Sequence, residues 1–347
     1  MSGNAGLLAV KSAERTANAE YVEMYHDVIL QRGFDEVHHL TAQLRGIRAD
    51  AVPLRRSLYS GVLSTVDFGD ITLQVVHSAP MLLLGISEEG TTSLIQVLEG
   101  TDQARWNGLS IEANDVAICC QDRPHEANYP DEFACAVLSF RTGADSALDP
   151  PVGPNFSHSG PGGIVHADPE THLTLAVMAE AVEQATAQTP SLFCNTEARH
   201  SLRASALDIV RDLLTPAGST ARRHGRDSRT RQRIIHKADE YLRANPARAV
   251  YTDELCVALG TSATRLHQAF HATFGVSPHR YLKMRRMAMV RSTLLSRTGP
   301  WHSVKAAALS YGFWHLGQFA HDYRAMYGES PSQTLARVLP TADDFSR

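Results

Sequence analysis

The sequence predicts an α+β protein, with a β-rich N-terminal domain of the jelly-roll or barrel kind that also contains helices, and an all-helical C-terminal domain with two helix-turn-helix motifs. Three observations predict this class. Short β-rich runs lie between residues 55 and 145, apolar residues recur at helical spacing from residue 169 onward, and one motif occurs twice in the last third of the chain. The length of 347 residues is typical of two domains, and a content of 43% hydrophobic and 20% charged residues excludes a disordered or fibrous chain.

Residues 1–50 are expected to form a mostly helical N-terminal extension, around Tyr21–Leu30 and Val37–Leu44, to which the sequence assigns no role. No basic stretch precedes the short apolar patch near the N-terminus, so we expect no secretory signal. Apolar runs such as Met81–Ile86 are far shorter than the roughly 18 residues of a membrane span. Five cysteines are too few for a disulfide framework. These features predict a cytoplasmic protein without a membrane partner.

Residues 51–214 are expected to form the β-rich domain, with its strands between 55 and 145. The clearest strand runs are Ile71–Val76, Met81–Gly85, Ser93–Glu99, Val116–Cys120 and Ala134–Phe140. The pair Asn107-Gly108 is typical of a two-residue hairpin turn. Two helices follow, at about 169–188 and 196–214, and each must bury an apolar stripe either against its own domain or in a dimer interface.

Charge divides the chain into an acidic part and a basic part. Residues 215–230 are small, polar and basic, which predicts a linker. Residues 222–338 contain 19 Lys and Arg against 7 Asp and Glu, whereas the remainder contains 14 against 30. A basic module on an acidic body is typical of a protein that binds a polyanion such as nucleic acid. Residues 339–347 are expected to form a tail.

The basic region contains an internal repeat. Thr252–Gly260 and Ala263–Phe274 have the pattern of two helices joined by a tight turn, with Ser262 as the N-cap of the second. The pattern recurs 53 positions later, where Leu266, Phe270, Phe274, Gly275, Ser277 and Pro278 are matched by Phe319, Tyr323, Tyr327, Gly328, Ser330 and Pro331. Between the copies, Tyr281–Leu295 is predicted to be a basic helix that holds them apart. Such a module can reach two successive major grooves, about 34 Å apart on one face of a duplex.

Residues 231–338 resemble the DNA-binding domain of the AraC/XylS family of bacterial transcription regulators. The resemblance is carried by Leu255 through Ser262, Leu266, Phe270, Gly275, Ser277-Pro278, Tyr281-Leu282, Arg286, Leu295, Val304, Ala308, Gly312-Phe313, Phe319, Tyr323, Gly328 and Ser330-Pro331. Cys256 departs from the small Ala that is usual in the family. Trp314 and His315 fill a turn where the family often has smaller acidic or polar residues.

The resemblance implies a sequence-specific DNA-binding transcriptional regulator, and specifically an activator. Its implied partners are double-stranded promoter or operator DNA, RNA polymerase, a second copy of the chain in a homodimer, and a small-molecule effector. Residues 51–214 would then bind the effector and dimerise, and effector occupancy would change how the two DNA-binding units are held. Two alternatives stay open: a regulator without an effector or one that responds to oxidation of Cys119, Cys120 or Cys135, and a cupin-like enzyme with a nucleic-acid-targeting domain.

The DNA contacts follow from the helix faces and from the family's base-reading positions. If Leu266 and Phe270 face inward, the polar residues between them face outward, and Gln side chains can read adenine with two hydrogen bonds. The predicted base-contacting residues are Thr264, His267, Gln268, His271, Gln318 and His321. The predicted contacts to the DNA backbone are Arg265, Lys283, Arg285 and Arg324. Leu316 and Gly317 offer no donors, so the second helix is expected to dock through the backbone and shape of the DNA.

The acidic domain offers candidates for an effector pocket but no catalytic constellation. Aromatic walls with a few polar anchors are typical of such pockets, and the candidates are Arg55, Tyr59, His77, Arg105 and Trp106. His77 and His125 are the only histidines between residues 55 and 145, and they form no His-x-His pair. A metal site needs two or three converging ligands. We therefore expect no metal, no cofactor, no catalytic residues and no enzymatic activity.

Overall fold

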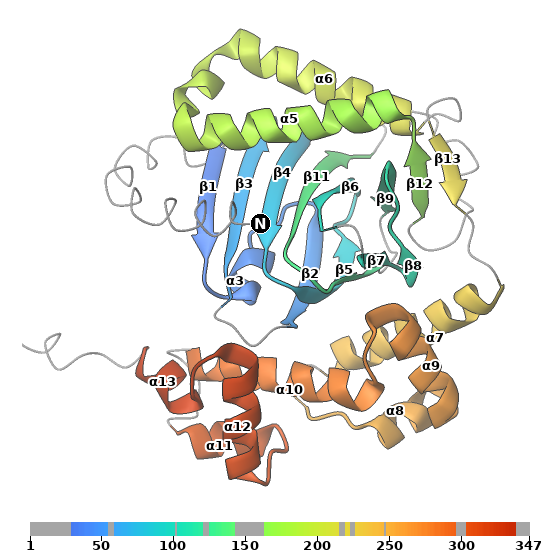
Figure 1. Cartoon of the computed structure of the whole chain (residues 1–347), viewed down its shortest axis with the longest axis vertical. Helices are drawn as coiled ribbons and strands as arrows, with labels where there is room; N and C mark the ends of the chain where they lie inside the picture. Colours follow the sequence, from blue (N-terminus) through green and yellow to red (C-terminus); the bar gives the residue numbers. More distant parts are fainter. Residues whose placement is uncertain are drawn as a thin grey trace, which may run out of the picture.

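The computed structural model describes residues 29–54, 59–100, 103–120, 125–142, 163–214, 219–222, 226–245, 248–295 and 303–337. A body of β-strands lies between the helix pair α5 (Pro169–Gln188) and α6 (Thr196–Leu214) on one side and the helices of residues 226–337 on the other (Figure 1). The predicted α+β class, with N-terminal antiparallel sheets and an all-helical C-terminal region, is confirmed. No helix in the described ranges is long and apolar enough to cross a membrane.

Two antiparallel sheets form the N-terminal domain within the described residues. The larger sheet has the order β1 (Ile29–Phe34), β3 (Gly61–Asp67), β4 (Ile71–Ser78), β11 (Phe133–Arg141), β6 (Thr91–Glu99), β9 (Asp115–Cys119), β12 (Ile164–Ala167) and β13 (Ser219–Arg222). The smaller sheet has the order β2 (Ile47–Pro53), β5 (Met81–Ser87), β10 (His125–Tyr129), β7 (Arg105–Trp106) and β8 (Leu109–Ser110). The predicted hairpin turn joins β7 to β8, and both Asn107 and Gly108 have the positive φ that this turn requires.

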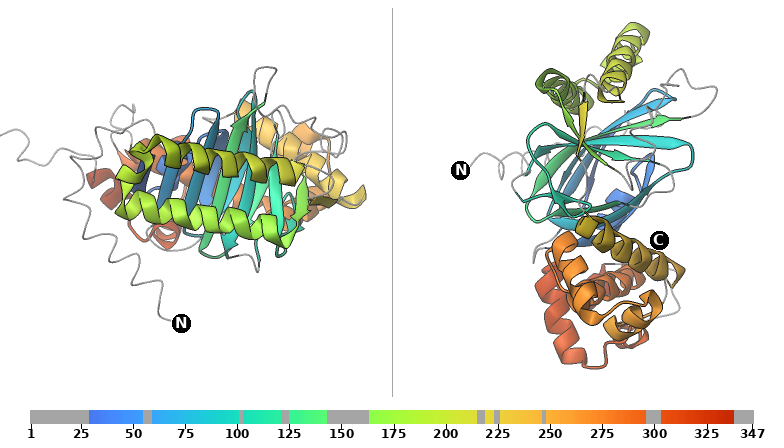
Figure 2. Two further views of the ribbon diagram at one scale, coloured as in Figure 1. Left: turned by 90° about the horizontal axis from the view of Figure 1, so that it is seen from above. Right: turned by 90° about the vertical axis from the view of Figure 1, so that its right-hand side faces the viewer.

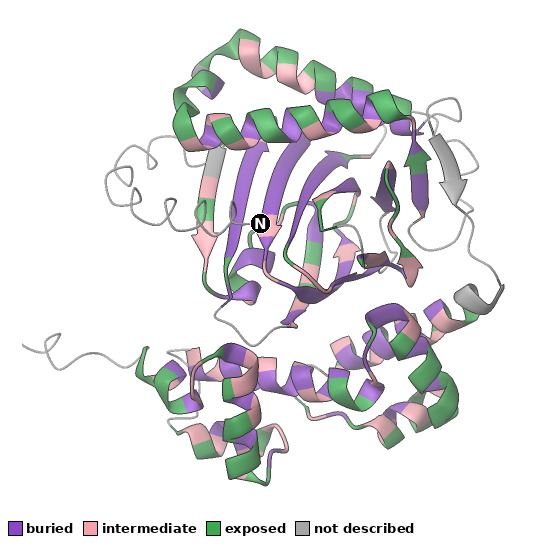
Figure 3. Ribbon diagram, viewed as in Figure 1, coloured by how far each residue is buried: buried purple, intermediate pink, exposed green. Residues whose placement is uncertain are grey.

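The larger sheet is buried on both faces, which explains its long apolar runs. Side chains alternate along a strand, so Val76 of β4 packs between the two sheets while Val75 faces α5 and α6. The two helices lie side by side across the strands of this sheet (Figure 2) and cover one core. The space between the sheets holds a second core that includes Tyr129 and Phe133. Most of the β-strands are coloured as buried in Figure 3.

Two sequence predictions about the connecting segments differ from the structure. Residues 1–50 were expected to be mostly helical, but in the part described only α3 (Val37–Thr41) is an α-helix, and β1 and β2 each pair with a neighbouring strand. Residues 1–28 lie outside the described residues. In the predicted linker 215–230, β13 pairs with β12 and the next helix begins at Arg226. In both places, pairing with a distant strand outweighs the local sequence signal.

Seven helices make up the described C-terminal region. They are α7 (Arg226–Ala244), α8 (Thr252–Leu259), α9 (Ala263–Phe274), α10 (Pro278–Leu295), α11 (Val304–Ser310), α12 (Leu316–Tyr327) and α13 (Pro331–Ala336). Helices α8 and α9 form the first helix-turn-helix unit, α11 and α12 form the second, and α10 connects them (Figure 1).

The second helices of the two units end with the same backbone geometry because their sequences repeat. Gly275 ends α9 and Gly328 ends α12, both with left-handed backbone, where glycine has no steric penalty. Ser262 caps α9 as predicted, since its side chain accepts a hydrogen bond from the backbone N–H of Arg265. Ser303 caps α11 in the same way.

Candidate nucleic-acid interface

Helix α9 presents a polar face to solvent. Leu266, Ala269 and Phe270 on its opposite face are fully buried, in a core shared with α7, α8 and α10. The predicted base-contacting side chains of this unit are all exposed: Thr264, His267, Gln268 and His271. The rings of His267 and His271 stack, with centroids 6.0 Å apart. This face therefore has amide, hydroxyl and imidazole groups free to meet base edges in a major groove.

Helix α12 presents the corresponding face of the second unit. Phe319, Tyr323 and Tyr327 anchor its inner side, while Gln318 and His321 are exposed. A Cβ atom added at Gly317 would meet nothing within 4 Å, so the start of this helix can approach another surface closely. In the turn before α12, Trp314 is 72% exposed. The second unit thus has fewer polar side chains that could contact base edges than the first. The start of its helix contains a glycine that leaves room for another surface, next to the exposed ring of Trp314.

Arg286 of α10 joins the two units. Its guanidinium lies over the rings of Tyr251 and Phe313, 4.6 and 5.0 Å from their centroids. Tyr251 precedes the first unit and Phe313 lies in the turn of the second, so one buried cation stacks on both. A Cβ at Gly312 would lie 2.2 Å from the hydroxyl of Tyr251, so this close approach requires glycine. The 18 residues of α10 span about 27 Å, which suits two units in successive grooves.

The four residues predicted to contact the DNA backbone have two different environments. Arg265 and Arg324 are exposed, and no ion pair among the described residues includes either of them. Lys283, in contrast, is half-buried with its amine 2.5 Å from a carboxylate oxygen of Asp322. Arg285 donates a hydrogen bond to the carbonyl of Leu242 at 2.9 Å. Lys283 and Arg285 thus have contacts within the protein that compete with contacts to phosphates.

A shallow groove runs between α7 and the exposed face of α9. Arg231 of α7 lines it together with Arg265, His267 and Gln268. Arg231 is half-buried and was not among the predicted DNA contacts. The available signal was the excess of Lys and Arg in residues 222–338, to which Arg231 belongs.

The N-terminal domain contacts the C-terminal end of α9. Arg105 donates to the carbonyl of Ala272 at 2.9 Å, and the amide of Asn128 donates to the carbonyl of Phe274 at 3.1 Å. The last carbonyls of a helix lack partners within the helix and carry partial negative charge. Groups on β7 and β10 therefore cap the reading helix of the first unit. Apolar contact joins the same surfaces, since Leu82 and Leu84 of β5 share a core with α9 and α10.

A buried ion pair connects the N-terminal domain to the second unit. Glu36, between β1 and α3, is 3% exposed, and one of its carboxylate oxygens lies 2.6 Å from Nε of Arg291 on α10. Glu329, at the end of α12, lies 2.9 Å from the same guanidinium. Burial by itself would lower the pKa of Arg291, but the hydrogen bond to Glu36 and the nearby carboxylates outweigh it and raise the pKa above its ordinary value, so Arg291 stays charged. Nearer the surface, Asp35 pairs with Arg337 at 2.5 Å.

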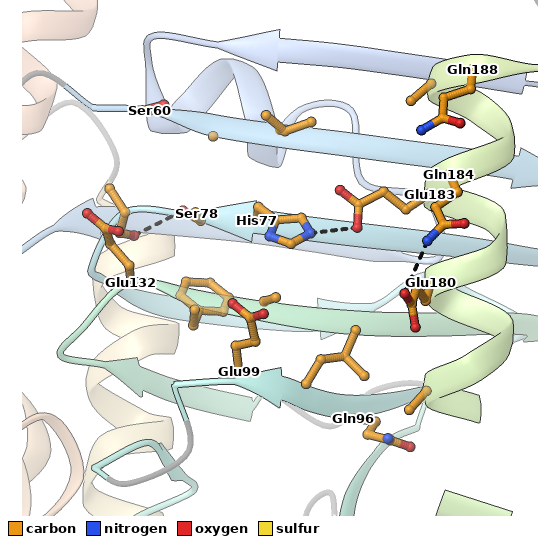
Figure 4. Close-up of a pocket in the computed structure, with 18 of the residues that line it drawn as sticks. Ser60, His77, Ser78, Gln96, Glu99, Glu132, Glu180, Glu183, Gln184 and Gln188 are labelled. Atoms are coloured by element: carbon orange, nitrogen blue, oxygen red, sulfur yellow. Dashed lines mark hydrogen bonds and ion pairs between the residues drawn. The ribbon is translucent and has the colours of Figure 1, made fainter. Parts of the chain in front are cut away.

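The residues predicted to bind an effector do not lie in one site. Arg105 contacts α9, and Trp106 is buried between the sheets, stacked on His125 at 4.7 Å between centroids. The hydroxyl of Tyr59 lies 2.8 Å from that of Ser78, and burial raises the pKa of Tyr59 to about 12. His77 lies in a cavity beside α5 (Figure 4). Arg55 lies outside the described residues.

Two ionisable groups are buried on β10 close to the domain interface. Burial lowers the pKa of His125 to about 3, and burial with the nearby Asp239 of α7 raises the pKa of Glu126 to about 8. Both are therefore uncharged at neutral pH. Among the described residues, no group of three or more His, Cys, Asp and Glu side chains is placed to hold a metal ion.

Two exposed reading helices on one rigid module, with a domain docked against both, define a helix-turn-helix DNA-binding protein. Residues 255–337 match the family described as "Helix-turn-helix domain". The XylDLEGF operon transcriptional activator 2 of Pseudomonas putida is 34% identical over 97 residues, which cover 28% of this chain and 62% of that protein. The XylDLEGF operon transcriptional activator 1 of the same species is 30% identical over 131 residues, which cover 37% of this chain and 38% of that protein. The match thus spans less than two thirds of either relative.

A solved structure extends the comparison. The crystal structure of a probable AraC family transcriptional regulator from Rhodopseudomonas palustris CGA009 is 38% identical in sequence, covering 31% of this chain and 99% of that one, with a TM-score of 0.29. The C-terminal helical region thus resembles the helix-turn-helix domain of AraC/XylS-family transcription regulators. A helix-turn-helix domain is typical of DNA-binding proteins, and both relatives are named as transcriptional activators.

Proposed function

We propose that the protein is a sequence-specific transcriptional activator that binds promoter DNA as a homodimer and responds to a small-molecule effector in its N-terminal domain. The observation that carries the proposal is the exposure of both reading faces on a module whose two halves each contact the N-terminal domain. Its partners would be double-stranded DNA and RNA polymerase, and its place the bacterial cytoplasm, where both are found. The activators among its relatives support the sign of regulation.

The two units divide the work of DNA recognition in this proposal. Gln268 reads an adenine with its amide, while Thr264 and His267 contact neighbouring base edges. The second unit contributes Gln318 and His321 and otherwise follows backbone and groove shape, because the start of α12 carries no strong donors. Arg265 and Arg324 bind phosphates, which positions both helices without reading sequence.

Effector control follows from the contacts between the domains. Arg105 and Asn128 hold the first unit at the end of α9, and Glu36 holds the second through Arg291. A change in the N-terminal domain that moves either of these groups of contacts alters the spacing or orientation of α9 and α12. An effector that binds one arrangement more tightly than the other then changes DNA affinity by that difference in binding free energy.

A thiol-responsive mechanism is less well supported. Burial raises the pKa of Cys119 well above its ordinary value and that of Cys135 to about 12. The thiolate is the reactive form, so burial disfavours oxidation of both thiols in the folded protein. Cys120 is only half-buried, and its replacement by serine provides a direct control for this alternative.

The proposal is tested by binding of the full-length chain to the promoter DNA beside its own gene, in competition with unrelated DNA and over a series of salt concentrations. Because Lys and Arg release counterions from phosphates, we expect a log–log slope of affinity against salt of magnitude about 5–10 for a dimer. Selective binding with such a slope supports a sequence-specific regulator. A flat salt response, or equal affinity for both DNAs, would contradict it.

A further inference from the structure

The groove between α7 and the exposed face of α9 is lined by groups that carry positive charge. Arg231 lines it from α7 and Arg265 from α9, together with His267 and His271, which are cationic when protonated. In the part of the chain that the structure describes, no Asp or Glu lines this groove. A concave surface with charges of one sign attracts groups of the opposite sign. The groove therefore suits an anion.

Arg231 is the arginine of this groove that the DNA contacts assigned above do not use. Its side chain is half-buried, and among the described residues it takes part in no ion pair. Lys283 and Arg285 on α10, in contrast, each have a partner within the protein. Arginine stays protonated at neutral pH, and its planar fork of N–H donors matches the oxygens of a phosphate. Arg231 can therefore bind a phosphate without giving up an ion pair with another described residue.

The place of the groove on the molecule identifies the anion. Gln268, which is proposed to read an adenine, lines the same groove as Arg231. An α-helix with its side chains is about 10–12 Å across, and a major groove is about 12 Å wide, so the sugar–phosphate backbone closely borders a helix that reads bases. Helix α7 packs directly against α9. The backbone that borders α9 on the side of α7 therefore passes over this groove.

We propose that the groove binds a phosphate of the DNA backbone and that Arg231 makes the contact. The guanidinium of Arg231 donates to the phosphate oxygens, and Arg265 faces the same strand from the other wall of the groove. The inference rests on the proposed function, because it adds a contact to the DNA-binding surface. That surface then extends beyond residues 255–337, which match the helix-turn-helix domain, and includes α7, a helix outside both units.

Helix α7 also contacts the N-terminal domain, near its other end. Arg243 donates to the carbonyl of Leu84 at 3.4 Å and lies 3.8 Å from a carboxylate oxygen of Asp50. It follows Arg231 by 12 residues in the sequence, which is about 18 Å along a helix axis. One helix thus connects the proposed phosphate site to the docked domain. The position of this wall of the groove depends on how that domain is docked.

The test measures the contribution of single phosphates to binding. A methylphosphonate group removes the charge of one phosphate, and a set of promoter duplexes carries one such group at each position of the protected segment. Full-length wild type and Arg231→Gln are titrated with every duplex. In the wild type, we expect one replacement beside the patch that α9 covers to weaken binding about three- to tenfold. In Arg231→Gln the same replacement should change the affinity by less than about twofold, because the contact is already lost.

Two further variants control for the loss of charge. Arg233→Gln removes the same charge from an exposed position of α7 that does not line the groove, and it should keep the wild-type pattern of methylphosphonate effects. Arg231→Lys keeps the charge and should retain the effect at the same phosphate. In Arg231→Gln, the log–log slope of affinity against salt should fall in magnitude by about 1 per protomer. The preference for promoter over unrelated DNA should stay within about twofold, since a phosphate contact does not read sequence.

The proposal is overturned if Arg231→Gln keeps every methylphosphonate effect of the wild type, or if Arg233→Gln loses the same effect as Arg231→Gln. Inorganic phosphate, followed by phosphorus NMR on the protein without DNA, is the probe for a free anion. If Arg231→Gln abolishes its saturable binding but keeps all the effects on DNA, the groove is a small-anion site and the proposal fails. Thermal unfolding shows whether each variant is folded, and Arg231→Ala serves if Arg231→Gln is not.

The same titrations separate this proposal from the proposed function. Equal affinity of the wild type for promoter and unrelated DNA would refute the sequence-specific regulator. The salt slope on unrelated DNA then still tests Arg231, because phosphate contacts also act in non-specific binding. A smaller slope in Arg231→Gln than in Arg233→Gln would support the phosphate contact, and equal slopes would overturn it.

Discussion

The buried contact between Glu36 and Arg291 provides a sharp test of domain docking. Replacing Glu36 by Gln removes one of two carboxylates around a buried guanidinium and leaves Glu329 in place. Breaking a buried ion pair costs about 3–5 kcal/mol. Because Glu329 still compensates Arg291 and the new amide can accept a hydrogen bond, we expect a loss of about 2–3 kcal/mol. If both domains remain folded, the free energy of docking between them is reduced by this amount, which shifts the docking equilibrium about 30- to 150-fold toward the undocked state.

Hydrogen exchange measured by mass spectrometry locates this effect. We expect faster exchange in α3, at the end of α9 and along α10 in Glu36→Gln, with the inner helix faces of both DNA-binding units still protected. Asp35→Asn is the matched control, since Asp35 is the residue before Glu36 and pairs with Arg337, but its side chain is largely exposed. Removing this exposed ion pair should cost less than about 1 kcal/mol. The reasoning is refuted if Glu36→Gln behaves like Asp35→Asn, or if the C-terminal helices themselves unfold.

Three further predictions concern pH, DNA reading and the cap on α9. Burial raises the pKa of Glu126 to about 8, so the stability that its protonated form contributes below pH 4.5 is lost as the pH rises through 8. Glu126→Gln should therefore lose less thermal stability than the wild type between pH 6.5 and 8. This window lies above the pH range in which His125 titrates, and equal losses in the two proteins would contradict the prediction. Gln268→Ala should reduce the DNA-binding free energy by about 1–3 kcal/mol through one base position, whereas Arg324→Ala should weaken binding to all DNA sequences alike. Affinities for single-base variants of the promoter site distinguish the two effects. A uniform loss for Gln268→Ala, or a loss at one base position for Arg324→Ala, would contradict these roles. Arg105→Ala removes the hydrogen bond to the carbonyl of Ala272, so hydrogen exchange at the end of α9 should become faster. Unchanged exchange there would show that this contact does not stabilise the end of the helix.

The elements that the sequence predicted correctly are those defined by local patterns. Helices α5 and α6 have the predicted bounds because their apolar spacing is regular and Asp168 caps the first of them. The two helix-turn-helix units were predicted from a repeated pattern, in which a glycine and then a serine follow α9 (Gly275, Ser277) and α12 (Gly328, Ser330), and both glycines have left-handed backbone. The hairpin at Asn107 follows from the same kind of local signal.

The features that the sequence did not predict depend on contacts between distant residues. Strands β1 and β13 pair with neighbours remote in the chain, and nothing near them in sequence signals that pairing. Arg105 was selected as a polar anchor of a pocket, but its partner Ala272 lies 167 residues away. Glu36 was overlooked because the residue that it neutralises, Arg291, lies 255 residues further on. The cavity beside α5 likewise requires the helix to be placed on the sheet before its residues can be grouped.

The measurement that most directly tests the central claim is a hydroxyl-radical footprint of the full-length protein on the promoter DNA beside its own gene. With two reading helices joined by α10, we predict two protected patches per protomer on one face of the duplex, about 34 Å apart. In Gln268→Ala, protection should weaken first in the patch that α9 covers. A single protected patch per protomer, or even protection along the whole fragment, would contradict the assignment of both units to DNA.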